Sequence, residues 1–359
     1  MTIRPPLVWL CAGFAGMLLS ACASSTKLPE GKLFHPVTTD GYPLSLEHFS
    51  AESNAQNKRF PVILCHGFMA SRKYYKMNGS RSLAMQLQKQ GYDVWLLDLR
   101  GRPDAGSPSL FYGEYTYDYN MDDYIHRDMD TAISFVMEQT GASGVNWIGH
   151  SMGGLIAYAR IGSLGEERIK NLVTIGSPFL FETPTRNLNT WNALGNCSFL
   201  LPVLPMGSMA RMERHSCISL SPDKYLMNMF WYPENLPEGM EGSMKEHTAN
   251  NIAIGVADQF AAAVEDGEVK SEDGAINYTR NLKRVRVPVL VLGGRRDHLG
   301  SPYMLREIYE SLGSEDKSLF IASRASGQSE DYGHTDLFVG TNAGEDVIPV
   351  ILEWLNERN

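Results

Sequence analysis

Short, continuous apolar runs recur along the chain and outline a sheet. They lie at residues 60–65, 92–98, 145–149, 171–176, 287–293 and 318–322. Such runs predict strands that are buried on both faces, which is typical of a parallel sheet. A different pattern comes first. Asp40 and Gly41 lie between alternating apolar and polar positions, which predicts an antiparallel hairpin at the start of the fold.

Helical segments separate these runs. Residues 80–91 begin at a serine suited to cap a helix, and residues 121–141 carry acidic residues in their first turn; each segment ends in glycine. The same alternation returns in residues 301–313 and 344–357, which follow the last two runs. Strand and helix in alternation predict an α/β fold, with a mostly parallel sheet and helices on both faces.

Residues 179–282 interrupt this alternation. The stretch is rich in Pro, Met and aromatic residues, as in LPVLPMGSMARM and YLMNMFWYPENLPEGM. We interpret it as a lid inserted into one enlarged domain, whose two parts are residues 33–178 and 283–359. A separate second domain is the alternative.

The N-terminal segment has the pattern of an export signal. Arg4 precedes an apolar stretch that is too short and too glycine-rich for a comfortable membrane span but suits a secretory signal core. The stretch ends in LLSAC, which resembles the lipobox of bacterial lipoproteins. By this resemblance residues 1–21 are a signal peptide, Cys22 is the lipidated residue and residues 22–32 are a tether. An ordinary signal peptide cut after Ala21 or Ala23 is the alternative.

The lipoprotein resemblance also implies a location. Two or three acyl chains on Cys22 give stable membrane anchoring where a single chain would be marginal. The non-acidic residue after the cysteine, Ala23, suggests delivery to the outer membrane of the bacterial cell envelope. The folded part would then face the periplasm.

Three cysteines remain for the folded part. Cys65 ends an apolar run and is expected to be a buried small hydrophobic residue rather than a reactive thiol. Cys197 and Cys217 could form a disulfide in an oxidising periplasm. Closing a loop of about 20 residues would contribute roughly 3 kcal/mol. The sequence leaves open whether the two are bonded.

Composition and charge narrow the class of protein. The chain of 359 residues is 43% hydrophobic and 20% charged, which is ordinary for a globular protein. A formal net charge of −9 argues against nucleic acid as a partner, because binding to phosphates draws on clustered excess Lys and Arg. No paired His or Cys metal ligands and no phosphate-binding glycine loop are present, so we expect neither a metal nor a cofactor.

The segment WIGHSMGGLIAYAR, residues 147–160, carries the main chemical signal. Ser151 lies in a Gly-x-Ser-x-Gly pattern between an apolar run and a helix-compatible run. The sharp turn needs small flanking residues, because a Cβ two residues before or after the serine would collide with a neighbouring element. The turn exposes the hydroxyl at a helix N-terminus, where the helix dipole and the amide of Met152 can stabilise developing negative charge.

A serine nucleophile needs a base, and the base needs an acid to orient it. Asp297 follows one apolar run and His334 follows the last, so both come at carboxyl ends of predicted strands, where open α/β sheets present their sites. Ser151, Asp297 and His334 follow the chain order of α/β-hydrolases. The alternatives are His298 as the base and Asp331 or Asp336 as the acid.

Residues 65–71, CHGFMAS, are expected to supply a second donor for the oxyanion. Gly67 lets the backbone turn sharply after the first parallel strand. The amide of Phe68 can then act together with that of Met152.

These motifs together resemble the α/β-hydrolase superfamily. The matching segments are VILCHGFMAS, GYDVWLLDLRGR, WIGHSMGG, VLVLGGRRDHLG and GHTDLFVG, and they look most like its acid-lipase and polyhydroxyalkanoate-synthase-like branch. The similarity covers residues 41–355 apart from the insertion. It implies Ser151 as nucleophile, His334 as base, Asp297 as acid, and Phe68 with Met152 as oxyanion donors.

Two departures from that branch are informative. Polyhydroxyalkanoate synthases have cysteine as the nucleophile, so the serine here disfavours polymerisation. Acid lipases usually have Asn-Ser-Arg-Gly where this chain has Asp98-Leu99-Arg100-Gly101.

The sequence therefore predicts a serine hydrolase that cleaves carboxylic esters through an acyl-enzyme. Its substrate would be a small-molecule or lipid ester, and Cys22 would place it at a membrane. The Met and aromatic residues of the lid either line an acyl pocket or only pack against the sheet. The alternatives are an acyltransferase, thioesterase or peptidase on the same triad, and a non-catalytic envelope lipoprotein.

Overall fold

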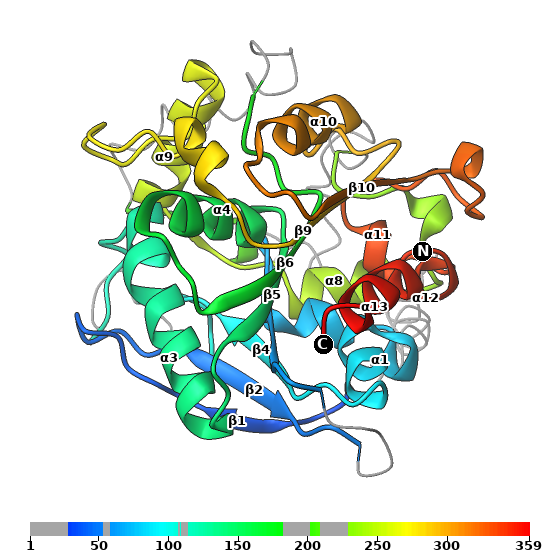
Figure 1. The fold of residues 1–359 in the computed structure, drawn as a ribbon. Coiled ribbons are helices and arrows are strands. Elements are labelled where there is room, and N and C mark those ends of the chain that lie inside the picture. Colours follow the sequence, from blue (N-terminus) through cyan, green and yellow to red (C-terminus); the bar gives the residue numbers. More distant parts are fainter. Residues whose placement is uncertain (1–27, 53–57, 107, 109–113, 182–201, 209–228) are drawn as a thin grey trace, which may run out of the picture.

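A computed structural model gives the architecture of the chain (Figure 1). It describes residues 28–52, 58–106, 108, 114–181, 202–208 and 229–359. Its centre is an eight-stranded sheet with the order β1-β2-β4-β3-β5-β6-β9-β10. Its strands are β1 Lys32–Phe34, β2 Ser45–Phe49, β3 Val62–Cys65, β4 Val94–Asp98, β5 Val145–His150, β6 Ile169–Ile175, β9 Val289–Gly294 and β10 Lys317–Ala322.

Strand directions agree with the hydrophobic pattern. β1 and β2 form the predicted antiparallel hairpin, with Lys32 opposite His48, and β2 is antiparallel to β4. Every other pair in this sheet is parallel. Each run predicted as a buried strand becomes a strand of the sheet. The prediction of a mostly parallel sheet is confirmed.

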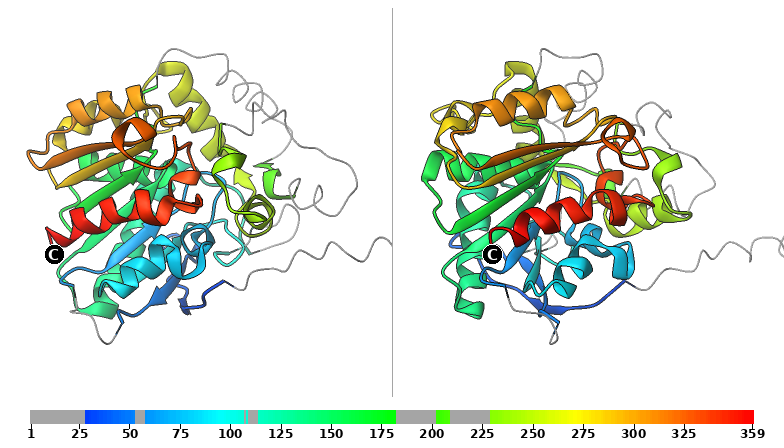
Figure 2. Two further views of the ribbon diagram at one scale, coloured as in Figure 1. Left: turned by 90° about the vertical axis from the view of Figure 1, so that its right-hand side faces the viewer. Right: turned by 45° about the vertical axis from the view of Figure 1, so that its right-hand side comes forward.

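Helices cover both faces of the sheet (Figures 1 and 2). Alternate residues of each strand point to opposite faces, so Ile63 joins the core under α3, α4 and α10, whereas Leu64 joins the core under α1 and α13. The helices outside the predicted lid are α1 Leu83–Lys89, α2 Met121–Asp123, α3 Met129–Thr140, α4 Met152–Leu164, α10 Pro302–Ser311, α11 Asp336–Val339, α12 Ala343–Asp346 and α13 Ile348–Asn356.

One helix differs from its prediction. The segment predicted as a single helix over residues 121–141 contains a π-helical turn, Tyr124–Asp128, between α2 and α3. Arg160 of α4 donates to the carbonyl oxygens of Ile125 and His126 in this turn, at 2.7 and 3.2 Å. A π turn adds one residue to the helix, and here it lets Asp128 face inward toward Arg100.

The described part of residues 179–282 contains short elements. They are β7 Val203–Leu204, a 3₁₀ turn Pro233–Asn235, α8 Met240–His247, β8 Ile252–Ala253, α9 Ile254–Asp266 and a 3₁₀ turn Thr279–Arg284. We call residues 229–253 the cap segment. It lies where the parallel strands end, as the yellow-green ribbon in Figure 2 shows. No helix within the described ranges is both long and apolar enough to cross a membrane.

Candidate active site

Ser151 occupies a strained turn between β5 and α4. Its φ of 51° and ψ of −120° make it the one residue other than glycine with positive φ among the described residues. Such a backbone costs of order 1–3 kcal/mol and persists only where the surroundings enforce it. An added Cβ at Gly149 would lie 2.3 Å from the backbone of Gly153, and one at Gly153 would lie 2.2 Å from the carbonyl oxygen of Cys65. The predicted need for small flanking residues is confirmed.

The loop after β3, residues 66–71, lies beside this serine, and we call it the β3 loop. An added Cβ at Gly67 would lie 3.0 Å from the Cβ of Ser151. The chain turns there, as predicted, because the amide of Ala70 donates to the carbonyl oxygen of Gly67 at 3.2 Å, although Gly67 is not among the described glycines with positive φ. It is glycine because two backbones approach closely there. Phe68 follows Gly67 in the β3 loop, and Met152 follows Ser151 as the first residue of α4.

Asp297 and His334 are joined by a buried hydrogen bond. Nδ1 of His334 lies 2.9 Å from Oδ2 of Asp297, and the two residues are 3% and 2% exposed. Oδ1 of Asp297 accepts from the amides of Leu299 and Gly300, both at 2.8 Å. The carboxylate is therefore fixed by its own loop and presents its second oxygen to the imidazole, which sets the imidazole tautomer.

Gly176, at the end of β6, makes room for this pair. Its φ is 56°, and an added Cβ would lie 2.8 Å from Oδ2 of Asp297 and 3.1 Å from Nδ1 of His334. Sequence reasoning did not single out Gly176. Gly176 could have been recognised from the sequence because it comes at the carboxyl end of a predicted strand, where the site was expected.

His150 connects the serine turn to the His334 side. It precedes Ser151, its ring centroid lies 4.6 Å from that of His334, and its Nε2 lies 3.2 Å from the His334 carbonyl oxygen. Burial, with the neighbouring His334, lowers the pKa of His150 well below its usual range. His150 is therefore neutral near pH 7, and it links the residue before Ser151 to the backbone of His334. Sequence reasoning missed this residue.

The alternative base and acids make other contacts. Nε2 of His298 lies 2.9 Å from the hydroxyl oxygen of Tyr232. The carboxylate of Asp331 accepts from the amide of Arg324 at 3.1 Å. Asp336 is buried, which raises its pKa, and it accepts from the side chain of Asn235. These contacts favour His334 and Asp297 over their alternatives.

The predicted cysteines and metal ligands lie apart from these contacts or outside the described residues. Cys22, Cys197 and Cys217 lie outside the described residues. Cys65 is buried with a free thiol whose pKa is raised by burial, as predicted for a small hydrophobic residue. Within the described ranges, no group of three or more His, Cys, Asp or Glu side chains could hold a metal ion.

Three features together are typical of the α/β-hydrolase fold. The sheet is mostly parallel, a strained serine follows β5, and an acid–histidine pair follows β9 and β10. Sequence comparison agrees with this class. The family described as the alpha/beta hydrolase fold matches residues 61–196. The chain has the α/β-hydrolase fold, and this match together with its relatives supports the α/β-hydrolase superfamily.

Several known proteins are similar to this chain. The poly(3-hydroxyalkanoate) polymerase subunit PhaC of Thiocystis violacea is 26% identical over 336 residues, which cover 88% of this chain and 86% of that protein. A tear acid lipase-like protein of Mesocricetus auratus is 22% identical and covers 86% of this chain and 83% of its own length. The structure of a monoglyceride lipase from Saccharomyces cerevisiae superimposes with a TM-score of 0.63 at 16% identity, over 93% of this chain and 97% of that one.

Proposed function

We propose that this protein is a serine hydrolase that cleaves carboxylic esters, with Ser151 as nucleophile, His334 as base and Asp297 as acid. The main support is the buried 2.9 Å bond between His334 and Asp297, together with a serine held in a strained turn at the start of α4. Nucleophile, base and orienting acid are the parts that acyl transfer needs. Lipases and esterases among its relatives and structural neighbours support ester hydrolysis for the family as a whole.

The proposed reaction has two steps. In the first, Oγ of Ser151 attacks the ester carbonyl carbon while His334 takes the serine proton, and His334 then gives that proton to the departing alcohol. In the second, His334 takes a proton from water, whose oxygen attacks the acyl-enzyme, and the proton returns to Ser151 as the acid leaves. Asp297 keeps the proton of the neutral imidazole on Nδ1, so that Nε2 can act as the base.

The oxyanion would form between two segments. We assign its stabilisation to the amides of Phe68 and Met152, because Gly67 contacts Ser151 closely and Met152 begins α4. The dipole of α4 adds to the effect. Each such donor is typically worth about 10²- to 10³-fold in kcat.

Transfer of the acyl group to another acceptor is the second candidate. The similarity to the polymerase subunit of Thiocystis violacea favours it, since a polymerase passes its chain to an acceptor other than water. Product analysis separates the two candidates. Hydrolysis gives free acid in amounts equal to the alcohol released, whereas transfer gives a new ester when a second alcohol is supplied.

We also propose that the chain is anchored to the cell envelope through lipid on Cys22, as its LLSAC motif indicates. Expression of the full chain in bacteria fed with labelled palmitate should label the wild type. It should not label Cys22→Ser. Equal labelling of both would remove this proposal without affecting the hydrolase assignment.

Fluorophosphonate labelling combined with ester turnover tests the central proposal. We expect one adduct on Ser151 and turnover of p-nitrophenyl esters, and neither in Ser151→Ala. Activity that rises with acyl length would support a lipase, and thioester and aminoacyl substrates run in parallel would identify the other options. A wild-type protein with neither adduct nor turnover would contradict the proposal.

A further inference from the structure

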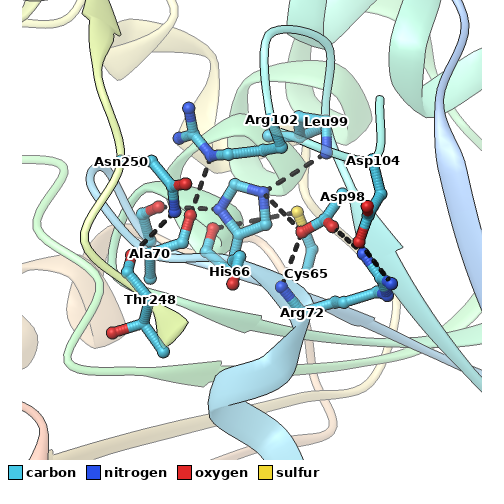
Figure 3. Close-up of polar contacts among 12 residues, drawn as sticks. Cys65, His66, Ala70, Arg72, Asp98, Leu99, Arg102, Asp104, Thr248 and Asn250 are labelled. Atoms are coloured by element: carbon cyan, nitrogen blue, oxygen red, sulfur yellow. Dashed lines mark hydrogen bonds and ion pairs between the residues drawn. The ribbon is translucent and has the colours of Figure 1, made fainter. Parts of the chain in front are cut away.

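Arg102 holds the β3 loop by bonds to its carbonyl oxygens. Its Nη2 donates to the oxygen of Phe68 at 2.7 Å and its Nε to that of Ala70 at 2.8 Å. Figure 3 shows the Arg102 side chain extending past His66 toward Ala70, beside Asn250. The guanidinium thus ties together two peptide groups of the segment that carries a proposed oxyanion donor.

The peptide group before Phe68 is fixed by a different residue. Nδ1 of His66 lies 2.8 Å from the carbonyl oxygen of Gly67, which shares a peptide plane with the amide of Phe68. The amide of Leu99 donates to Nε2 of His66 at 3.3 Å, so the proton must be on Nδ1. Burial, followed by the charge of Arg102, lowers the pKa of His66 well below its usual range and keeps this tautomer neutral.

Arg102 also connects the β3 loop to the cap segment. Its Nη1 donates to the carbonyl oxygen of Asn251 at 3.3 Å. Nearby, the backbone amide and the side chain of Asn250 both donate to the carbonyl oxygen of Met69, at 3.0 and 3.2 Å. The carbonyls of residues 68, 69 and 70 are therefore all held from outside the loop, and the cap segment supplies one of the two sources.

The setting of Arg102 is unusual for a buried cation. It is 1% exposed, and among the described residues no carboxylate forms a salt bridge with it. A buried charge is costly unless it is paired or well hydrogen-bonded. Here the three carbonyl oxygens supply that compensation, and two of them belong to the β3 loop.

We propose that Arg102 is a positioning residue for ester cleavage: it fixes the β3 loop so that the amide of Phe68 meets the oxyanion, and it makes that geometry depend on the cap segment. The inference rests on the hydrolase assignment above. His66 fixes the peptide plane on one side of Phe68 and Arg102 the plane on the other. The planar, forked guanidinium suits this role, because its separate N–H groups reach several acceptors at once.

The test compares Arg102→Gln and Arg102→Lys with wild type in the purified protein. We expect Arg102→Gln to lower kcat by about 10²-fold, comparable with losing one oxyanion donor, while KM changes less than about threefold. Lysine keeps the charge without the fork, so Arg102→Lys should recover kcat only in part. Binding of an alkyl boronic acid, which forms a tetrahedral adduct with serine, should weaken in parallel with kcat/KM.

A matched control separates positioning from stability. Arg160 is also buried and also donates to two backbone carbonyls, but these lie in the π turn, away from the β3 loop, and Arg160 in addition forms salt bridges with Asp130 and Glu166. Arg160→Gln should lower the melting temperature with little change in kcat. If Arg102→Gln does not fold, Asn250→Ala replaces it, with an expected decrease in kcat of about three- to tenfold.

The experiments test the Arg102 inference and the hydrolase assignment separately. A folded Arg102→Gln with wild-type kcat and boronic acid affinity would overturn this inference, as would a loss confined to KM. The hydrolase assignment fails independently, in the wild type, if no ester is cleaved and no adduct forms on Ser151.

Discussion

The two sides of the candidate site are built from different kinds of interaction. On one side, a hydrogen bond joins the carboxylate of Asp297 to Nδ1 of the His334 imidazole, whose other nitrogen takes and returns a proton in the proposed reaction. On the other side, the β3 loop is fixed by His66 and Arg102 through bonds to backbone carbonyls, and the proposed reaction moves no proton at either residue. The first side is suited to move protons, and the second to present fixed dipoles.

This difference predicts how substitutions on each side affect activity and stability. Fixed dipoles stabilise a transition state without reorganising, provided that their geometry is held to fractions of an ångström. A proton-transfer pair needs the correct tautomer as well as position. Substitutions on the two sides should therefore give different combinations of activity, stability and pH dependence.

The largest effect is expected at Ser151, which lies between the two sides. Ser151→Gly should lower kcat by about 10⁵- to 10⁶-fold and raise the free energy of unfolding by up to about 1 kcal/mol, since glycine relieves the positive φ. Ser151→Ala should lose the same activity without the gain, because alanine keeps the strain. Kinetics and urea unfolding measure both. Equal stability of the two variants would show that the turn is not strained.

Asp297→Asn should lower kcat by about 10⁴-fold with little change in fold. Asparagine can still accept from the amides of Leu299 and Gly300, but it no longer favours the imidazole tautomer with the proton on Nδ1. Asp331→Asn, an alternative acid that contacts Arg324 instead, is the control and should remain near wild type. The reverse result would transfer the acid role to Asp331.

Gly176→Ala should disturb the acid–histidine side by a direct steric contact. Its Cβ would lie 2.8 Å from Oδ2 of Asp297, so we expect kcat to fall by about 10- to 10²-fold and stability by about 1–2 kcal/mol. Gly165→Ala is a matched control. Gly165 also has positive φ, 67°, but an added Cβ would meet nothing within 4 Å. It should show the stability loss alone, and a comparable loss of kcat there would refute the steric explanation.

The last prediction concerns the dependence of stability on pH, which leaves the catalytic groups unchanged. His66 and His150 have lowered pKa values in the fold, so below about pH 6.5 the unfolded chain binds more protons than the folded one. Stability should therefore fall as pH falls from 6.5 to 5, by about 1.4 kcal/mol per pH unit for each histidine. His150→Gln should remove the contribution of one histidine from the slope of unfolding free energy against pH, as measured by urea unfolding at several pH values. An unchanged slope would show that His150 binds protons equally in the folded and unfolded chain, which would contradict its lowered pKa.

Much of the fold follows from the sequence because burial on both faces leaves a direct signal. The parallel strands are short apolar runs, and helices form within residues 80–91 and 301–313, although the first is capped by Ser82 and not by Ser80, at which the predicted helix began. The π turn at Tyr124–Asp128 left no such signal, because its periodicity differs little from that of an α-helix. It depends on Arg160 and Arg100, which are distant in the sequence.

The candidate site was predictable to a similar extent. Chain order and position after strands pointed to Ser151, Asp297 and His334, since these rules concern where strands end. Gly176 and Arg102 were missed because their roles come from contacts across the fold. Arg102 lies 149 residues from Asn251 along the chain. No local pattern carries information about such a contact.

The bonds from Arg102 and Asn250 have a consequence for protein engineering. Replacing the insertion with one from another hydrolase is an obvious route to new substrates. The backbone groups of residues 247–251, however, form hydrogen bonds with Ser71 and Met69 of the β3 loop and with Arg102, which holds that loop. A graft that ends before residue 247 retains these bonds, whereas one that extends beyond residue 251 discards part of the support for the reaction centre together with the old specificity.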